Sequence, residues 1–212
     1  MPLGATSTLL VVRSNVRAIT LTQSVQFSGL LEGTLTDFIN DAVRLVRGLA
    51  RNSLKQFYYT EFAATIAASI DLSSINIFDA MSMRLVLNSD SSQIPIVPRN
   101  VYNNMLQLHT FTTGQWIATL TTTAAGTFGL LVGGAATPAG AGTLAFERNP
   151  TKAAADVTVL DIPDQLVPIV QDIACLNVWR SQNKQPMADV LQRVRLFTDE
   201  QLRGTRLMKE SQ

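Results

Sequence analysis

Residues 161–180 read DIPDQLVPIVQDIACLNVWR, and the pattern of this stretch decides the fold of the C-terminal third. An acidic residue stands on either side of Ile162-Pro163, an arrangement typical of the first turn of a helix. Apolar side chains then recur at helical spacing at Leu166, Val170, Ile173, Ala174 and Val178. A polar turn at 183–185 precedes a second stripe at Met187, Val190, Leu191, Val194 and Phe197. Because antiparallel helices joined by short turns bury such stripes, we predict a helical hairpin over residues 160–210.

A further helical pattern lies upstream, over residues 35–57. Thr36 is the expected N-cap, and Asp37 suits the positive end of the helix dipole. The apolar stripe consists of Phe38, Ala42, Leu45 and Leu49. Four cations recur at intervals of three and four residues, which predicts that they line one face of the helix: Arg44, Arg47, Arg51 and Lys55.

The remaining segments are expected to be extended. Residues 1–30 are rich in Ser, Thr and Val with a weak alternation, which favours an extended N-terminal arm or an edge strand. From residue 58 to residue 150 the helical period disappears. Strands are expected at 81–87, 115–123 and 144–148, with a polar turn at 88–92 and another turn or connection beginning at 97–100.

A run of small residues from Gly133 to Gly142 interrupts this region. It carries few side chains that can be buried, so we expect a flexible linker or a loop that contacts neighbouring copies. It lacks the Lys-Ser/Thr end and the glycine spacing of a nucleotide-binding loop.

Together these elements predict an α+β protein that forms a single domain over residues 1–212. Its main part would be an α-helical bundle, made of the N-terminal helix and the two C-terminal helices. A β-rich insertion at residues 58–150 would stand in the middle of that bundle.

Composition narrows the function classes. The chain is 46% hydrophobic and only 16% charged, with a formal net charge of +1. This disfavours a disordered protein and gives no global electrostatic reason to bind nucleic acid. Residues 100–146 contain no Asp, Glu, Lys or Arg, which favours burial against neighbouring protein. A membrane span over 116–136 is disfavoured because that stretch is rich in Thr and Gly.

The single Cys and the single His exclude an internal disulfide and any zinc site with several Cys or His ligands. Cys175 lies in an apolar helical pattern and is interpreted as a small buried hydrophobic residue. His109 has no acidic residue nearby in sequence that would orient it for catalysis. We therefore expect no enzyme activity, no catalytic residue, no metal and no cofactor.

Four stretches of the chain resemble a known family. Residues 36–44 (TDFINDAVR) resemble the opening helix of head-to-tail adaptor proteins, also called connector or neck proteins, of tailed bacteriophages. Residues 144–150 (LAFERNP) resemble the final strand of that family, and residues 161–170 (DIPDQLVPIV) the start of its penultimate helix. Residues 188–207 resemble its last helix, with Phe197 where the family often carries a bulky residue. The likeness rests on pattern and on the order of the elements over residues 35–210.

This resemblance implies a structural virion protein located in the neck, with the host cytoplasm as its place of assembly. Such adaptors form a ring, typically of twelve copies, between the portal protein and the tail. They extend the DNA channel and offer a docking surface for tail or nozzle proteins, without contact with a membrane. The implied partners are therefore the portal, the tail proteins, other copies of the chain and, non-specifically, double-stranded DNA.

Two sets of cations are candidate contact residues. The row formed by Arg44, Arg47, Arg51 and Lys55 has three interpretations: an ordinary solvated face, pairing with acidic residues of the next subunit, or a positive ring that faces DNA. A second set lies at the C-terminus and is expected to dock on an acidic portal surface: Arg203, Arg206 and Lys209.

Three other classes compete with the adaptor. A tail terminator, a tail tube or another minor virion protein would have strands in excess of helices. An enzyme with Ser or Asp chemistry would need a motif such as GxSxG or a supported carboxylate pair, and neither occurs in the sequence. A membrane-active protein would use residues 116–136.

Overall fold

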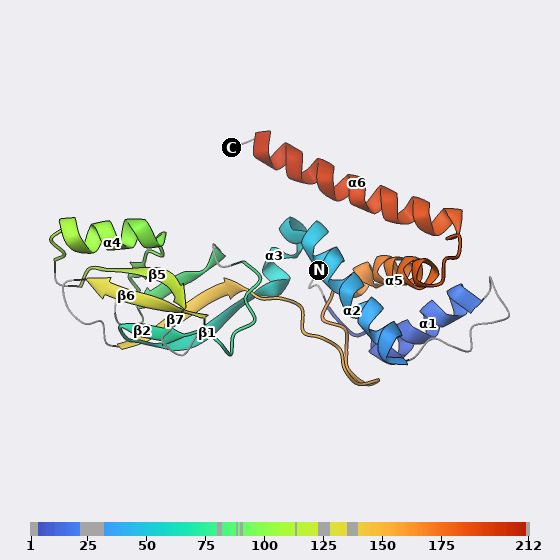
Figure 1. The fold of residues 1–212 in the computed structure, drawn as a ribbon, viewed down its shortest axis with the longest axis horizontal. Coiled ribbons are helices and arrows are strands. Elements are labelled where there is room, and N and C mark those ends of the chain that lie inside the picture. Colours follow the sequence, from blue (N-terminus) through green and yellow to red (C-terminus); the bar gives the residue numbers. More distant parts are fainter. Residues whose placement is uncertain are drawn as a thin grey trace. The chain divides into compact units, whose positions relative to one another are not determined.

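The structure, a computed structural model, describes residues 4–21, 32–79, 82–87, 89, 91–112, 114–122, 128–134 and 140–210. The predicted α+β class is confirmed, with six α-helices and seven strands among these residues. The chain divides into two compact units (Figure 1). Unit 1 comprises residues 1–57 and 150–212, and unit 2 comprises residues 58–149.

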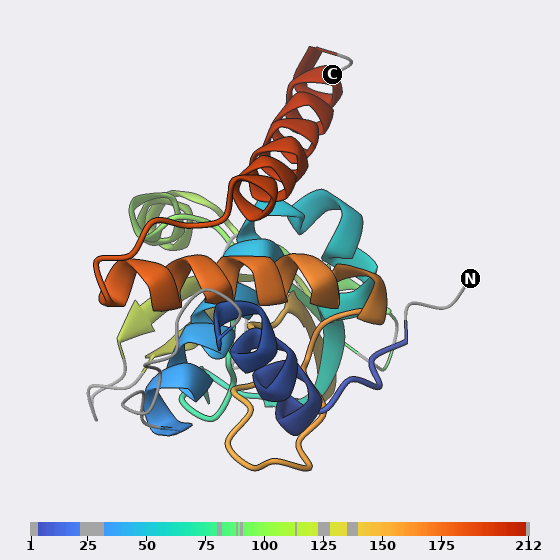
Figure 2. The same ribbon diagram turned by 90° about the vertical axis from the view of Figure 1, so that its right-hand side faces the viewer.

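Unit 1 is built from helices around one central helix. It contains α1 (Leu9–Leu21), α2 (Glu32–Leu49), α3 (Arg51–Tyr58, which ends at the unit boundary), a 3₁₀ turn (Asp164–Leu166), α5 (Val167–Ser181) and α6 (Ala188–Glu210). Helix α5 contacts α1, α2 and α6. Figure 2 shows α5 (orange) beside α1 (dark blue). Most of the side chains of α5 are therefore buried, including Val170, Cys175 and Trp179. The predicted helical hairpin is present as α5 and α6, and Cys175 is buried as expected.

The expected extended arm at 1–30 is wrong where the structure describes it, because residues 9–21 form α1. The sequence there is rich in β-branched residues, which locally favour strands. Leu9, Val12 and Val16, however, are spaced three and four apart, and all three are fully buried in the core of unit 1. Packing of that stripe outweighs the local preference. Residues 22–30 of the expected arm lie outside the described residues.

The helix predicted over 35–57 is divided into α2 and α3, and it begins earlier than expected. Helix α2 starts at Glu32, so Thr36 is not the N-cap. The Thr36 hydroxyl instead donates a hydrogen bond to the Glu32 carbonyl, 2.9 Å away, one turn back inside the helix. Ala50 separates the two helices, although its amide still donates to the Val46 carbonyl.

A buried amide attaches the 150–160 segment to α2. Asn40 Nδ2 donates to the Ala153 carbonyl at 3.0 Å, and the Ala153 amide donates to Asn40 Oδ1 at 2.9 Å. Both bonds are buried, and they satisfy backbone groups in a segment that has no regular secondary structure of its own.

Unit 2 consists of two antiparallel sheets that share one core. The first sheet has the order β1 (Tyr59–Ile66), β7 (Gly140–Glu147), β3 (Arg84–Leu87) and β4 (Gln93–Ile94). The second has the order β2 (Ser69–Asp71), β6 (Phe128–Gly134) and β5 (Trp116–Thr122). The core takes side chains from both sheets, such as Leu85 and Leu144 from the first and Ala118 and Leu130 from the second. Strands β3, β5 and β7 lie where the sequence predicts strands.

Helix α4 (Arg99–Leu108) is a correction, because the sequence predicts a turn or connection there and no helix between residues 58 and 150. Pro98 immediately precedes it, a residue that sets the backbone angle for helix initiation without needing a donor. Tyr102 and Leu106 lie one turn apart and reach Gly133 of β6, whose missing side chain makes room for them. The helix is therefore specified by a contact with a distant strand rather than by a long periodic pattern.

The small-residue run is also partly a correction. Gly133 and Gly134 end β6, and Gly140, Ala141 and Gly142 begin β7, so the described part of this run is strand rather than loop. Residues 135–139 lie outside the described residues. Gly142 pairs with Ala64 of β1 and Leu87 of β3, which places it in an inner strand.

The first prediction concerns Gly142. A Cβ added there would meet the Ile66 side chain and lie 2.9 Å from the Val86 carbonyl oxygen. We expect Gly142→Ala to destabilise unit 2 by about 1–3 kcal/mol, because overpacking forces side chains and backbone to shift. Urea unfolding followed by Trp116 fluorescence, in a Trp179→Phe background, measures this, since the chain's two tryptophans lie one in each unit.

Gly48→Ala is the matched control for this prediction. Gly48 lies on the exposed side of α2, and no atom stands within 4 Å of an added Cβ. Alanine there should stabilise unit 1 by up to about 1 kcal/mol, since glycine is a poor helix former. If Gly142→Ala does not lower the free energy of unfolding of unit 2, as Gly48→Ala is not expected to lower that of unit 1, the packing described for β7 is contradicted.

Candidate functional site

The four predicted cations of 44–55 do not form one exposed row. Arg44 on α2 and Lys55 on α3 are exposed, and Arg51 is half-buried. Arg47 is fully buried, which corrects the expectation of a continuous basic face. Its position adjoins the buried stripe of α2 that includes Val43 and Val46, so the packing of that helix encloses it. The exposed cationic surface reduces to Arg44 and Lys55, with part of Arg51.

The C-terminal cations belong to α6. Arg203 is exposed, as is its neighbour Leu202. The side chains of Arg206 and Lys209 lie outside the described part of the chain, although the backbone there is helical. Helix α6 has 23 residues and α5 has 15, so α6 is the longer helix of the hairpin. The C-terminal part of α6 is therefore not matched by α5.

One arginine fixes the first half of α6 to the central helix. The Arg193 guanidinium donates two hydrogen bonds to the Asp172 carboxylate, both at 2.7 Å, and a third to Asp189 at 3.0 Å. Asp172 lies on α5 and is nearly buried. The bond to Arg193 lowers the pKa of Asp189, and the bond to Asp172 raises the pKa of Arg193. A bidentate pair holds a definite orientation, so the hairpin presents the rest of α6 in a set direction.

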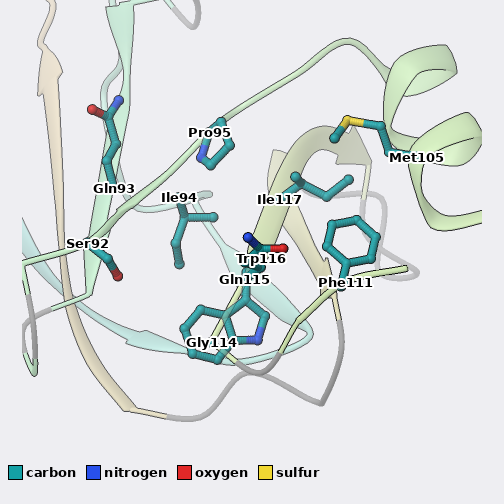
Figure 3. Close-up of a pocket in the computed structure, with 10 residues that line it drawn as sticks. All are labelled: Ser92, Gln93, Ile94, Pro95, Met105, Phe111, Gly114, Gln115, Trp116 and Ile117. Carbon is teal, nitrogen blue, oxygen red and sulfur yellow. The ribbon is translucent and has the colours of Figure 1, made fainter. Parts of the chain in front are cut away.

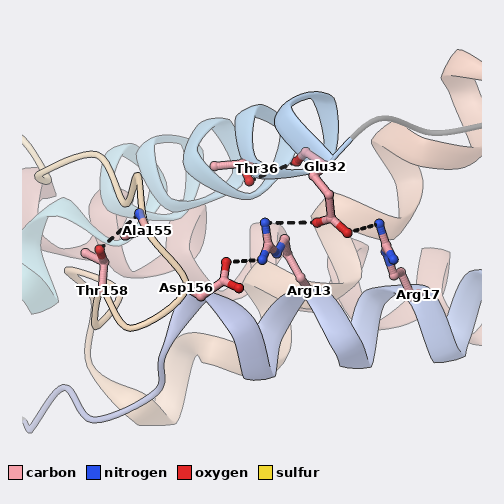
Figure 4. Close-up of polar contacts among 7 residues, drawn as sticks. All are labelled: Arg13, Arg17, Glu32, Thr36, Ala155, Asp156 and Thr158. Atoms are coloured by element: carbon pink, nitrogen blue, oxygen red, sulfur yellow. Dashed lines mark hydrogen bonds and ion pairs between the residues drawn. The ribbon is translucent and has the colours of Figure 1, made fainter.

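A second polar cluster holds α1 in place (Figure 4). Arg13 of α1 donates to Glu32, the first residue of α2, at 2.9 Å, and it also pairs with Asp156. Arg17, one turn further along α1, pairs with the same Glu32. The Arg13 side chain is only 12% exposed, so its charge is neutralised in a partly enclosed site. The cluster joins three segments of unit 1 that are far apart in sequence.

The start of the hairpin is attached to the N-terminal segment through Asp164. Its carboxylate accepts hydrogen bonds from the Thr6 amide and hydroxyl and from the Ser7 amide and hydroxyl, at 2.6 to 3.1 Å. These donors, the Thr6 hydroxyl first among them, hold the pKa of Asp164 at about 2. The acidic residue that the sequence assigns to helix initiation therefore also orders residues 6 and 7.

The two residues considered for catalysis do not form a site. Burial raises the pKa of Cys175 to about 12, and the nearby Asp172 charge is the second cause. The thiol therefore stays protonated at neutral pH and supplies no thiolate nucleophile. His109 is exposed at the C-terminal end of α4. Within the described ranges, no group of three or more His, Cys, Asp or Glu side chains is placed to hold a metal ion.

Unit 2 contains a pocket of about 400 Å³ (Figure 3). Its lining comes from β4 and the residues around it, from the start of β5, and from Met105 of α4 with Phe111. The apolar members are Ile94, Pro95, Met105, Phe111, Trp116 and Ile117, and the rest are Ser92, Gln93, Gly114 and Gln115. This volume and this mixture of apolar walls with a few amides are typical of binding pockets.

These sites are only partly visible in the sequence. Nothing in the sequence predicts the pocket, although the uncharged stretch 100–146 that borders it indicates a surface for protein contact. The Arg193–Asp172 pair is missed as well. A single carboxylate inside an apolar helical stripe is a signal for such a pair, because a buried charge needs a partner.

No helix among the described residues has both the length and the apolar character required to cross a membrane. The stretch 116–136, considered as a span, contains strands β5 and β6 in its described part. No protein-family model matches this chain, and no curated protein matches it in sequence.

The second prediction follows from Asp164. A carboxylate with a lowered folded-state pKa stabilises the fold above its unfolded-state pKa of about 3.9, and this contribution is lost as the pH falls through about 2. We expect Asp164→Asn to make the stability of unit 1 less dependent on pH in that window. Urea unfolding followed by Trp179 fluorescence in a Trp116→Phe background measures it.

Thr6→Val supplies the comparison, since it removes the hydroxyl that lowers the Asp164 pKa most. It should flatten the same pH dependence, but to a smaller extent because three donors remain. Identical pH profiles for the parent and for Asp164→Asn would contradict this role of the carboxylate.

Proposed function

We propose that this chain is a structural protein of a tailed-bacteriophage virion, a head-to-tail adaptor that forms a ring between the portal and the tail. The observation that carries the proposal is the order of elements along the chain. A helix over 32–49 precedes a β-rich unit, β7 leads into the Asp161-Ile162-Pro163-Asp164 turn, and the hairpin of α5 and α6 closes the fold. This is the order of the family that the sequence resembles.

Three further observations support an adaptor. The residues of the β-rich unit lie in the sequence between the two stretches that form the helical unit, which suits a helical bundle with a β-rich insertion. More of the described residues lie in helices than in strands, unlike the strand-rich folds of tail tubes and tail terminators. The β-rich unit has a long uncharged segment, which suits burial in an assembly.

In this proposal the ring surrounds DNA and presents three contact surfaces. Arg44 and Lys55 are the exposed cations that would face the phosphate backbone, where contact needs no base recognition. The C-terminal half of α6, with Arg203, Arg206 and Lys209, would dock on an acidic surface of the portal. The β-rich unit would contact neighbouring copies or the tail.

Electron microscopy of the purified chain mixed with the portal protein of the same genome tests the proposal. We expect a ring of this chain, coaxial with the portal and matched to it in symmetry. A portal that stays bare at saturating concentrations of the chain would contradict the adaptor function.

The third prediction concerns the docking surface. A chain that ends after Leu202, or one in which Arg203, Arg206 and Lys209 are all changed to Glu, should lose portal binding while its circular dichroism keeps the helical signal. Arg195→Glu is the control, because Arg195 is exposed on the first half of the same helix. Unchanged portal binding by the truncated chain would reject this surface.

The fourth prediction concerns DNA. Arg44→Glu combined with Lys55→Glu should weaken non-specific DNA binding by the assembled ring. The double substitution should also flatten the salt dependence of that binding, with the slope falling by about 0.9 for each phosphate that is no longer neutralised. Arg84→Glu, an exposed cation of unit 2, is the matched control. A salt slope unchanged by the double substitution would contradict DNA contact and leave an ordinary solvated face or pairing with acidic residues of the next subunit.

A further inference from the structure

Strand β1 forms one edge of its sheet, where it pairs with β7 (Figure 1). In an antiparallel pair, every second residue exchanges hydrogen bonds with the neighbouring strand, and the backbone groups of the others point away from it. The Arg148 amide donates to the Tyr58 carbonyl at 3.0 Å, which continues the β1–β7 register by one pair and fixes this alternation. The even-numbered residues of β1 therefore bond to β7. The residues whose backbone groups point outward are Tyr59, Glu61, Ala63 and Thr65.

The outer edge of β1 is open. Within the described part of the chain, no hydrogen bond joins the backbone of these outward-pointing residues to another segment, and all of them are exposed. Natural edge strands are commonly protected by proline, lysine or a β-bulge. The sequence of β1, YTEFAATI, contains neither proline nor lysine, and its register with β7 runs without a bulge over eight residues. This edge is therefore available to a further strand.

The other sheet edges of unit 2 are closed or short. The segment that follows β4 is joined to β5 by a parallel bridge between Ile96 and Ala118. The Ala118 amide donates to the Pro95 carbonyl, and the Val97 amide donates to the Ala118 carbonyl, both at 2.8 Å. Strand β2, the other edge of the second sheet, is three residues long. Among the described residues of unit 2, β1 is thus the one edge strand longer than three residues that is open along its whole length.

A strand edge selects its partner by backbone chemistry. Its alternating N–H and C=O groups are satisfied by another extended strand, and a helix or a flat apolar surface offers them no matching set of donors and acceptors. In a second copy of the chain, the long edge that is open in the same way is β1 itself. A two-fold axis pairs a strand with its own copy in the antiparallel direction, so two β1 strands are complementary to each other.

We propose that β1 of one copy pairs antiparallel with β1 of a second copy, with Phe62 opposite Phe62 at a two-fold axis. Tyr59 then lies opposite Thr65 of the other strand. Glu61 lies opposite Ala63 in the same way. All of these are outward-pointing residues, so the pairs exchange backbone hydrogen bonds, and the two four-stranded sheets become one continuous sheet.

The side chains favour this register over the two neighbouring ones. Phe62 is 40% exposed, although it shares a face of β1 with the buried Ala64 and Ile66. In the proposed register the two Phe62 rings form a non-hydrogen-bonded cross-strand pair and cover each other, which is stabilising. An axis at Glu61 would set two like charges opposite each other. An axis at Ala63 would place Phe62 opposite Ala64 and lose the aromatic pair.

This inference goes beyond the adaptor function and does not rest on it. A two-fold contact is isologous, so it joins two copies and does not propagate around a ring. It describes the chain before it is placed on a portal. The two proposals are therefore tested separately: a bare portal leaves the β1 pair standing, and a monomeric chain leaves the adaptor function standing.

A single cysteine at the axis tests the pairing. Phe62→Cys sets two thiols opposite each other in a non-hydrogen-bonded pair, where the Cβ atoms approach closely enough for a disulfide. The native Cys175 is buried and stays protonated at neutral pH, so it does not compete. Mild oxidation of the full-length variant should give covalent dimers on a non-reducing gel, and no larger species because the contact is symmetric.

Phe128→Cys is the matched control, because Phe128 lies on β6 and is 41% exposed, nearly the same as Phe62. It should stay monomeric under the same oxidation. Equal dimer yields from the two variants would indicate chance collision and overturn the proposal. A higher yield from Glu61→Cys or Ala63→Cys than from Phe62→Cys would place the axis elsewhere and overturn the register.

A mixing experiment keeps the Phe62 ring in place. Tyr59→Cys and Thr65→Cys chains should each stay uncoupled when treated alone with a short bismaleimide, because equal positions lie far apart along the paired strands. The mixture of the two variants should give covalent dimers. No dimer from the mixture, or equal amounts from either variant alone, would contradict the antiparallel pairing of residue 59 with residue 65.

Proline at Ala63 tests the backbone hydrogen bonds without a cross-link. The Ala63 amide points away from β7, so Ala63→Pro removes a donor at the outer edge and keeps the bonds within the sheet. Self-association measured by sedimentation velocity should weaken by about tenfold or more, the effect of losing one or two hydrogen bonds. Circular dichroism checks that the variant is folded.

Phe62→Lys is the second variant, and it removes the need for proline to be tolerated. It places two like charges opposite each other at the axis, so it should also weaken self-association, whereas Phe128→Lys should not. A chain that is monomeric at every concentration would overturn the inference. Folded Ala63→Pro and Phe62→Lys variants that associate as the parent does would overturn it as well.

Discussion

Helix α5 is enclosed by α1, α2 and α6, and the burial of its side chains sets the arrangement of unit 1. A helix covered on several sides must be apolar around most of its circumference, and any charge on it needs a partner. Asp172 is that charge, and Arg193 neutralises it with two hydrogen bonds. This ion pair offsets the cost of burying the Asp172 charge on α5, and it also orients α6.

The periphery of unit 1 is held by polar contacts of the same kind. Asn40 satisfies the backbone of Ala153, Asp164 orders Thr6 and Ser7, and Arg13 joins α1 to two other segments. Each of these contacts connects residues far apart in sequence. Asn40 and Arg13 thereby fix the conformation of the irregular 150–160 segment, including the exposed turn at 155–159.

The sequence predicted the α+β class, the hairpin and the strand at 116–122, and it predicted β7 from residue 144 onward. The start of β7 at 140–142 was missed, because its run of small residues lacks a strand pattern. The prediction also failed at α1 and α4. In α1, β-branched residues favour a strand locally, and only the contact with the core selects the helix. Helix α4 is short, and its packing side chains need Gly133 as their counterpart. The prediction of one continuous basic face was wrong because spacing alone does not say which side of α2 is covered by other helices. Arg47 lies on the covered side and is buried.

Local spacing and composition were therefore sufficient to predict the helical hairpin, some of the strands and the burial of Cys175. They were also sufficient to identify the uncharged stretch at 100–146. Those properties depend on neighbours within a few residues or on simple counting. The pocket beside α4 and the enclosure of Arg47 arise when distant segments meet. Where a residue departs from a local apolar pattern, its burial depends on the folded surroundings, and a short window of residues does not contain that information.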